Sequence, residues 1–216
     1  MASAPVGATE PSRDCPFCPR LAEFRDQARR LNPDWHNAPV PSFGNPAARL
    51  LIVGLAPGLR GANRTGRPFT GDYAGDLLYA CLLRHGLAEG EYQARPDDGM
   101  TLPRARLTNA ARCVPPENKP LPAELKSCRP FLKAEIDQAR NLRAILALGQ
   151  IAHTQVLAAL GERQAAFPFR HGAQYTLKNG LVLADSYHCS RYNTNTGRLT
   201  ADMFDTVIRN VAALLA

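Results

Sequence analysis

A short aliphatic run that leads into a glycine-rich loop constrains this chain more than any other stretch. Residues 49–53 read Arg-Leu-Leu-Ile-Val, and this run, which Gly54 follows, is typical of a buried parallel strand. A loop dense in Gly, Pro and Arg follows, and an apolar helical pattern begins near Asp72. Open α/β sheets bind ligands where such strands end, and arginines there suit an anion. The spacing matches neither the phosphate-loop lysine motif nor the dinucleotide fingerprint, so the ligand stays open at this point.

The rest of the chain alternates between strand and helix patterns. Further strands are expected at 105–109, 143–148 and 180–188, and the irregular stretch 165–180 leaves room for a short one at 175–177. Helices are expected at 14–31, 72–85, 123–139, 151–160 and from 200 onward. This alternation predicts a three-layer α/β/α sandwich with a central, mostly parallel sheet of about four strands. The loops after the first, second and last of these strands should meet at one edge of the sheet.

Bulk properties indicate a single globular domain with an anionic partner. The 216 residues are expected to form one domain over 13–216, behind a disordered tail at 1–12. No apolar run is long enough to cross a membrane, and the N-terminus lacks a signal-peptide pattern, so we expect a cytoplasmic protein. The net charge of +7 favours a polyanionic partner such as nucleic acid.

The six cysteines point to a metal rather than to disulfides, because disulfides are rare in the cytoplasm. Cys15 and Cys18 form a C-x-x-C pair, and Cys113 and Cys128 form a second, wider pair in a basic, proline-rich stretch. Four thiolates in two pairs fit a structural zinc or an iron–sulfur cluster. The wide second pair is unlike a zinc ribbon, and this difference favours an iron–sulfur cluster over zinc only slightly. Cys81 lies in an apolar helical pattern and is expected to be buried and inert.

Four longer segments carry a resemblance to a known family. They are 54–58 (Gly-Leu-Ala-Pro-Gly), 61–72 (Gly-Ala-Asn-Arg-Thr-Gly-Arg-Pro-Phe-Thr-Gly-Asp), 108–120 (Thr-Asn-Ala-Ala-Arg-Cys-Val-Pro-Pro-Glu-Asn-Lys-Pro) and 186–200 (Ser-Tyr-His-Cys-Ser-Arg-Tyr-Asn-Thr-Asn-Thr-Gly-Arg-Leu-Thr). Together they resemble the family 5 (type b) branch of the uracil-DNA glycosylase superfamily, from Cys15 to the C-terminal helix. The resemblance implies a structural [4Fe–4S] cluster on Cys15, Cys18, Cys113 and Cys128.

The resemblance also implies an activity. The expected protein is a monofunctional DNA glycosylase that hydrolyses the N-glycosidic bond of uracil and of other damaged bases, namely hydroxymethyluracil, hypoxanthine and ethenocytosine, and so initiates base excision repair. Its partner would be double-stranded DNA, with single-stranded DNA left open, and it would act at the nucleoid as a monomer. Such an enzyme must flip the base into a pocket. It must also stabilise positive charge on the sugar and negative charge on the departing base.

The matching motifs assign those tasks to individual residues. Asp72 is expected to activate water and stabilise the sugar cation, and His188 to donate to the base oxygen as that oxygen becomes anionic. Asn109 would read the base edge, and Phe69 would stack on the base. Ala56 stands where other branches of the superfamily carry a catalytic Asp or Asn, an absence that accompanies the broader substrate range of type b. Base-binding residues are thus Gly54, Ala56, Phe69 and Asn109.

The last motif also supplies a wedge that would hold the flipped base out of the duplex. Arg191 and Tyr192 are its expected tip, and the expected DNA contacts are Arg64, Ser190 and Asn193. The family loop reads His-Pro-Ser, whereas this chain has His188-Cys189-Ser190. Because proline fixes φ, we expect Cys189 to loosen the loop.

Other interpretations of these residues stay open. Asp72 could simply cap the following helix, and Cys189 with His188 could form a thiol–imidazole pair, although neighbouring side chains at a strand end usually face opposite sides. At the level of the whole protein, one alternative is an attenuated or non-catalytic iron–sulfur protein that binds damaged DNA. Another is a zinc-stapled nucleic-acid-binding protein, which would be colourless where an iron–sulfur protein is brown.

Overall fold

A six-stranded sheet forms the centre of the computed structural model, which describes residues 7–215. The four strands in its middle are parallel, and a short antiparallel strand is added at each edge, in the order β1-β3-β2-β4-β6-β5. The expected mostly parallel sheet is therefore confirmed, but it has six strands where about four were expected. One of the two edge strands, at Gln174–Thr176, overlaps the stretch 175–177 where a short strand was left open. The strands are β1 (Phe43–Gly44), β2 (Leu50–Gly54), β3 (Ala105–Asn109), β4 (Ala144–Leu148), β5 (Gln174–Thr176) and β6 (Val182–Ser186).

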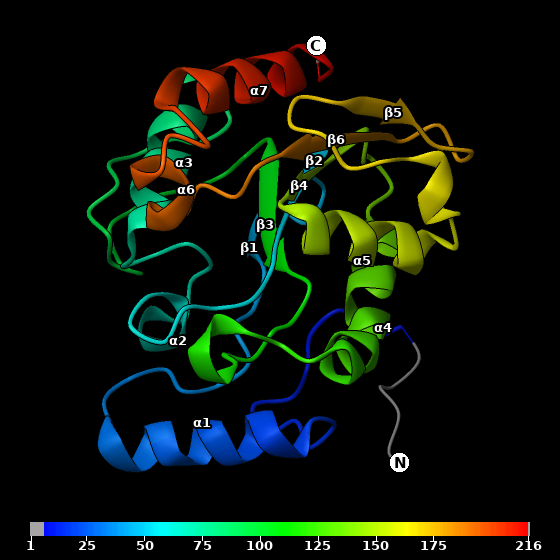
Figure 1. Ribbon diagram of the computed structural model, residues 1–216. Coiled ribbons are helices and arrows are strands. Elements are labelled where there is room, and N and C mark those ends of the chain that lie inside the picture. Colours follow the sequence, from blue (N-terminus) through cyan, green and yellow to red (C-terminus); the bar gives the residue numbers. More distant parts are fainter. Residues whose placement is uncertain (1–6, 216) are drawn as a thin grey trace.

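Helices cover both faces of this sheet and complete the three layers (Figure 1). One face packs against α3 and α7, and the other against α4 and α5. In the view of Figure 1, α1 crosses the bottom of the molecule, away from the sheet. The α-helices are α1 (Pro19–Leu31), α2 (Ala62–Thr65), α3 (Tyr73–Arg84), α4 (Pro122–Gln138), α5 (Gln150–Leu160), α6 (Arg191–Asn195) and α7 (Ala201–Ala213); the 3₁₀ turns are η1 (Pro116–Asn118) and η2 (Gln164–Ala166).

Strand β2 shows why a central strand can be a continuous aliphatic run. Its side chains alternate between the two faces: Leu50 and Ile52 join the cluster formed with α3 and α7, whereas Leu51 and Val53 join the cluster formed with α4 and α5. All four are at most 2% exposed. Both faces are apolar because both are covered, which is the usual condition of a parallel sheet.

The parallel register brings the strand ends to one edge of the sheet. Gly54, the last residue of β2, pairs with Asn109, the last residue of β3, and Leu148 of β4 pairs with Ser186 of β6. The chain segments that leave these four ends therefore start side by side. This edge is where the expected functional loops converge.

The start of the described chain differs from the expected disordered tail. Glu10 accepts a hydrogen bond from the buried guanidinium of Arg112 at 2.9 Å and another from the Ser42 backbone N–H at 3.0 Å. The Gly7 carbonyl accepts from the Gln138 side chain at 2.6 Å. A buried arginine needs carboxylate partners, and Glu10 supplies one from a segment that sequence pattern alone marks as polar and structureless. Residues 1–6 lie outside the described part of the chain.

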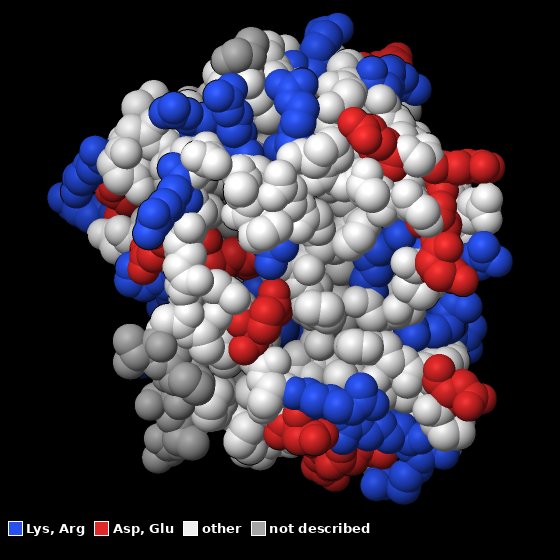
Figure 2. All heavy atoms as spheres, turned by 180° about the vertical axis from the view of Figure 1, so that it is seen from behind, with Lys and Arg blue, Asp and Glu red and all other residues white. Residues whose placement is uncertain are grey.

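One face of the surface carries charges of both signs. Figure 2 shows the face turned away from the view of Figure 1: its centre is largely uncharged, and Lys and Arg lie mainly around its edge, with Asp and Glu among them at the right and at the bottom. The positive excess is thus not gathered there into one block. Among residues 7–215, no helix combines the length and the apolar character that crossing a membrane requires.

Candidate active site

Two connected cavities open at the carboxyl edge of the sheet. The larger has a volume of about 780 Å³, and a narrow inner one measures about 30 Å³. Asp72 and His188 line both cavities, as do Ala56, Gly58 and Ala74. Phe69 and Asn109 line the inner cavity alone. The structure therefore brings both expected catalytic residues to the junction of the two cavities and places two expected base-binding residues at the inner end.

Asp72 has two roles in this geometry. As N-cap of α3, its Oδ1 accepts a hydrogen bond from the Gly75 N–H at 3.3 Å, so the capping interpretation is confirmed. Its Oδ2 lies against the turn at Gly58 and Gly61, where an added Cβ would come within 3.1 Å and 2.4 Å respectively. Burial raises the pKa of this carboxyl, and the backbone N–H groups of Ala74 and Gly75 oppose that rise. A carboxylate that caps a helix can thus also face a cavity.

His188 follows β6 and faces the same junction. Its ring centre lies 6.1 Å from that of Phe69, with the two planes tilted by 31°. Burial lowers the pKa of His188 to about 4. The imidazole is therefore neutral at pH 7 and keeps one N–H that can donate. Its backbone is fixed by Asn193, whose side-chain amide donates to the His188 carbonyl at 2.8 Å.

The inner cavity is built around a close approach of three residues. A Cβ added at Gly54 would lie 2.4 Å from Asn109 Oδ1 and 2.4 Å from Phe69 Cζ. Asn109 and Phe69 are 4% and 6% exposed. Phe69 has a φ of 53°, a left-handed conformation that is uncommon for an aromatic residue. Gly54, Phe69 and Asn109 are thus brought together as the motifs predicted, and Ala56 adds a small apolar wall to the same cavity.

The rim of the larger cavity carries cations from two loops. Arg60 and Arg191 both line it, and the Arg191 guanidinium lies 5.4 Å from the ring centre of Tyr73. Ser190 also lines it and caps α6 by accepting from the Asn193 N–H.

Three of the expected DNA-contacting residues lie away from the cavity lining. Tyr192 stands on α6 with 72% of its surface exposed. Arg64 folds back so that its Nε donates to the Arg60 carbonyl at 2.8 Å. The Asn193 amide faces inward to His188, so it shapes the loop from within.

The prediction missed several lining residues. Arg60 belongs to the glycine-rich loop but was not singled out, and Asn118 comes from η1. Gly149 and Gln150 follow the end of β4 and also line the larger cavity. The rule that ligands bind at the carboxyl ends of parallel strands would have identified the β4 loop, which carries no charged residue to attract notice.

Cys189 faces away from His188. Its side chain is fully buried in the core cluster beside α3, and its thiol donates to the Ala74 carbonyl at 3.4 Å. Burial raises the pKa of this thiol far above its usual range. A neutral, enclosed thiol does not serve as a nucleophile, so the thiol–imidazole pair is not supported. The thiol instead ties the loop to α3, a contact that proline lacks.

The four paired cysteines line a separate small cavity. Cys15, Cys18, Cys113 and Cys128 all belong to its wall, and the Arg112 N–H donates to Cys128 Sγ at 3.3 Å. Burial, together with the neighbouring cysteines, raises the pKa of Cys18 to about 11 and of Cys113 to about 12. Among residues 7–215, no three His, Cys, Asp or Glu side chains are grouped as ligands of a metal ion.

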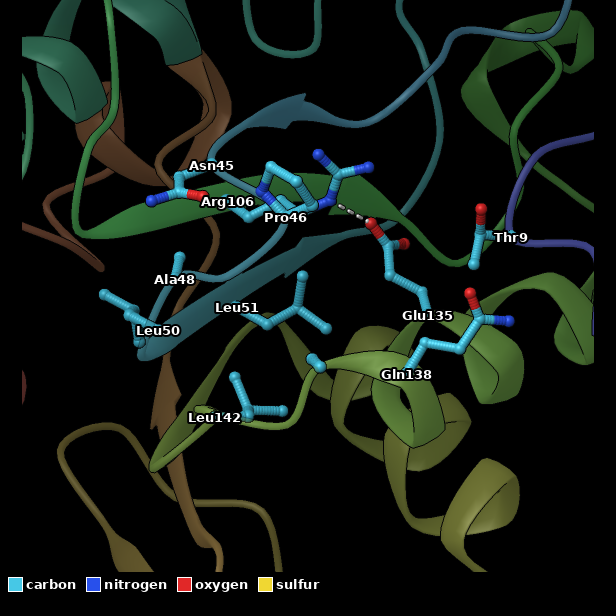
Figure 3. Close-up of a pocket in the computed structure, with 11 residues that line it drawn as sticks. Thr9, Asn45, Pro46, Ala48, Leu50, Leu51, Arg106, Glu135, Gln138 and Leu142 are labelled. Atoms are coloured by element: carbon cyan, nitrogen blue, oxygen red, sulfur yellow. Dashed lines mark hydrogen bonds and ion pairs between the residues drawn. The ribbon is translucent and has the colours of Figure 1, made fainter.

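A further cavity of about 180 Å³ lies at the opposite, amino edge of the sheet (Figure 3). Its polar end is formed by Arg106 and Glu135, joined by an Nε–Oε1 hydrogen bond of 2.7 Å, and Gln138 and Thr9 stand beside them. Leu142 and Leu51 form its apolar end. Because the charged groups satisfy each other, this cavity offers no free acid or base.

Comparison with known proteins gives a consistent result. The model of the uracil DNA glycosylase superfamily matches residues 41–212. A type-5 uracil-DNA glycosylase of Thermus thermophilus is 47% identical over 206 residues, which cover 93% of each chain. One of Pyrobaculum aerophilum is 40% identical over 204 residues, or 93% of this chain and 88% of the relative. A type-4 uracil-DNA glycosylase of Sulfurisphaera tokodaii is 28% identical over 199 residues, or 89% of this chain and 78% of the relative.

The chain thus belongs to the uracil-DNA glycosylase superfamily. Its higher identity to the type-5 relatives than to the type-4 relative confirms the branch that the four motifs indicated.

Proposed function

We propose that this protein hydrolyses the N-glycosidic bond of uracil in DNA and leaves an abasic site. The observation that carries the proposal is the junction of the two cavities, where Asp72 and His188 stand together with Phe69 and Asn109 directly behind them. This arrangement offers a carboxylate for the sugar side of the bond and a neutral donor for the base side. The type-5 relatives support the same reaction.

The chemistry follows from the charge that each group carries. As the bond breaks, the sugar becomes cationic and the base anionic. The Asp72 carboxylate would stabilise the cation and orient the attacking water, and it would accept the proton that the water loses as its oxygen bonds to the sugar carbon. The base leaves as an anion and takes up a proton from solvent. His188, neutral at pH 7, would donate a hydrogen bond from its one N–H to the base oxygen as that oxygen gains negative charge. Partial enclosure strengthens both interactions relative to bulk water.

We propose a substrate range that includes hypoxanthine, hydroxymethyluracil and ethenocytosine. Ala56 supports this, since a methyl group at that wall makes no hydrogen bond that would restrict the base. Asn109 remains the polar group at the inner end, and its amide can both donate and accept. Recognition would then rest on shape and on one amide rather than on a strict set of partners.

Double-stranded DNA fits the rim of the larger cavity. Arg60 and Arg191 would contact phosphates, and the exposed Tyr192 on α6 would fill the gap left by the flipped base. A protein that acts on duplex DNA must unstack the base before it reaches the site, and the exposed ring of Tyr192, the residue after Arg191 of the cavity lining, suits that step.

A [4Fe–4S] cluster on Cys15, Cys18, Cys113 and Cys128 is the second part of the proposal. The fit rests on donor chemistry: four sulfur side chains line one cavity, and a backbone N–H already points at one of them. Burial raises the pKa values of the Cys18, Cys113 and Cys128 thiols, and bound iron would stabilise the thiolate form of its ligands. The cluster would supply structural cross-linking of α1, the 110–118 loop and α4.

A base-release assay tests the catalytic assignment. Duplexes carrying uracil opposite guanine, uracil opposite adenine, hypoxanthine or ethenocytosine are incubated with the protein and then treated with alkali. We expect cleavage at uracil and at the other lesions, and a loss of about 100-fold or more in Asp72→Asn and His188→Gln. Asp76→Asn is the matched control, because Asp76 lies exposed one turn along the same helix.

Three results would contradict parts of this assignment. No cleavage by the wild type would overturn the function. Undiminished cleavage by both variants would overturn the residue roles. The attenuated binder would be favoured if the wild type binds uracil-containing DNA tightly without releasing the base, and if Cys189→Pro raises the rate of base release at least about tenfold.

The cluster is tested on the purified protein itself. We expect a brown protein with broad absorption near roughly 400 nm, iron and acid-labile sulfide in about equal amounts, and loss of colour in Cys113→Ser. Cys81→Ser should keep its colour, because Cys81 is not in the wall of the cysteine cavity. A colourless protein with one zinc ion would favour the zinc alternative.

A further inference from the structure

The segment between α3 and β3 makes a buried contact with the active-site loop that the reaction itself does not explain. Glu89 and Thr101 exchange two backbone hydrogen bonds of 2.9 Å and so close the base of a loop at residues 90–100, here called the buttress loop. In Figure 1 it lies beside α3 on the left of the molecule. Within the described part of the chain, no residue of the buttress loop lines either of the two active-site cavities.

An enclosed ion pair joins the buttress loop to the loop that carries Phe69 and Asp72. The Arg67 guanidinium meets Asp98 through two parallel contacts of 2.7 Å, and the side chains are 4% and 0% exposed. Its Nε donates to Thr70 Oγ1 at 2.7 Å. Such a bidentate pair fixes orientation as well as distance.

Aromatic rings surround the same guanidinium. Arg67 lies 5.0 Å from the ring centre of Phe43, 5.3 Å from that of Tyr79 and 5.8 Å from that of Tyr92. Tyr79 and Tyr92 stack with their centres 4.4 Å apart. The cation is therefore held from several sides, and its position is determined by groups outside the active site.

Tyr92 reaches the backbone of the active-site loop directly. Its hydroxyl donates to the Phe69 carbonyl at 3.3 Å and accepts from the Gly71 N–H at 3.4 Å. Phe69, whose carbonyl makes the first of these contacts, is the residue with the left-handed φ of 53°. Gly75 makes room for this arrangement, since a Cβ there would lie 1.8 Å from the Phe69 carbonyl and 2.5 Å from the Tyr92 hydroxyl.

We infer that Tyr92 and Asp98 are positioning residues for base excision, which hold Phe69 in its left-handed conformation and thereby fix the inner end of the base pocket. A left-handed aromatic residue persists only where its surroundings determine it, and here the buttress loop supplies them. The inference rests on the proposed function for its kinetic consequence. The structural restraint itself can be measured without that function.

The kinetic test separates chemistry from DNA binding. Tyr92→Phe, which removes only the hydroxyl, should lower the single-turnover rate of uracil release about fivefold, and Asp98→Asn about 20-fold. Affinity for a duplex with an abasic-site analogue should stay within about twofold, because the rim is untouched. Asp97→Asn, in the same loop but 76% exposed, is the matched control and should change neither quantity.

A double-mutant cycle identifies the route of the effect. In a Phe69→Ala background, Tyr92→Phe should cost less than about twofold, because the ring that it positions is gone. A full fivefold loss in that background, or an equal loss in Asp97→Asn, would overturn the inference. If Asp98→Asn does not fold, the Tyr92→Phe cycle still decides.

Amide hydrogen exchange gives a readout that needs no activity. Residues 66–72 should exchange faster in Tyr92→Phe and Asp98→Asn than in the wild type and in Asp97→Asn. Unchanged exchange would overturn the inference. If the wild type releases no base but the exchange differs as expected, the proposed function fails while the restraint on Phe69 stands.

Discussion

Gly54 and Asn109 are cross-strand neighbours at the last positions of β2 and β3, and the missing side chain of Gly54 leaves the space that the Asn109 amide occupies. A methyl group at Gly54 would come within 2.4 Å of Asn109 Oδ1 and of Phe69 Cζ. The missing side chain of Gly54 in β2 thus shapes the inner cavity as much as the side chain of Asn109 in β3 does.

The first prediction concerns that space. Gly54→Ala should displace the Asn109 amide and the Phe69 ring, and it should lower the rate of uracil release by about tenfold or more. Single-turnover assays measure the rate, and a thermal melt checks that the fold is retained. Asn109→Ala is the comparison. The double variant gives the check. If its free-energy cost in the rate of uracil release equals the sum of the two single costs, the two positions act independently and the proposed clash is not the cause.

A second prediction follows from the half-buried imidazole of His188. Its pKa is lowered to about 4, so the ring stays neutral and able to donate through one N–H as the pH falls from 8 to 5. The single-turnover rate should therefore show no loss near pH 6.5, where an exposed histidine titrates. An inflection near pH 6.5 that vanishes in His188→Gln would show that the histidine is protonated in the working range.

A third prediction concerns the buried thiol of Cys189. Cys189→Ala should destabilise the protein by about 1 kcal/mol, because it leaves a small void and removes the bond to the Ala74 carbonyl. Uracil release should stay within about twofold of the wild type, since the thiol faces the core. Loss of activity in Cys189→Ala, at unchanged melting temperature, would revive the thiol–imidazole pair.

A fourth prediction concerns the ion pairs around Arg112. Glu135 is 4% exposed and bonds Arg112 at 2.7 Å and Arg106 at 2.7 Å. Glu135→Ala should lower the free energy of unfolding by about 3 kcal/mol, because it leaves a buried guanidinium short of a carboxylate. Glu117→Ala, at a side chain that is 78% exposed, should change it by less than about 0.5 kcal/mol. Equal effects in urea unfolding would contradict the assigned burial cost.

The four central strands could be predicted because each is a short run that separates two helical patterns, and β2 and β4 are also continuous aliphatic runs. The edge strands were harder for a physical reason: β1 has two residues and follows a proline-rich loop, and β5 has three. Strands this short show no periodicity, and their pairing depends on neighbours distant in the sequence. The short helices α2 and α6 lie inside loops and were missed for the same reason.

The candidate active-site residues that lie in sequence motifs could be predicted. The residues that only tertiary contacts bring to the site could not. Asp72, His188, Phe69 and Asn109 lie in motifs, and all four line the inner cavity. Tyr92 and Asp98 lie in a stretch that looks like an ordinary loop, and only tertiary contacts give them a role. Arg112 likewise belongs to a motif, but its partner Glu10 lies in the segment that polarity marked as a tail.

The brevity of the two edge strands has a consequence for the behaviour of the protein in solution. An open sheet can recruit further strands through unpaired N–H and C=O groups at its margins, and that recruitment is a common start of aggregation. Here the margins are β1 and β5, with two and three residues. The longer strands β2, β3, β4 and β6, which could pair with another chain more readily, all lie inside the sheet. The sheet thus ends on both sides in stretches too short to template another chain.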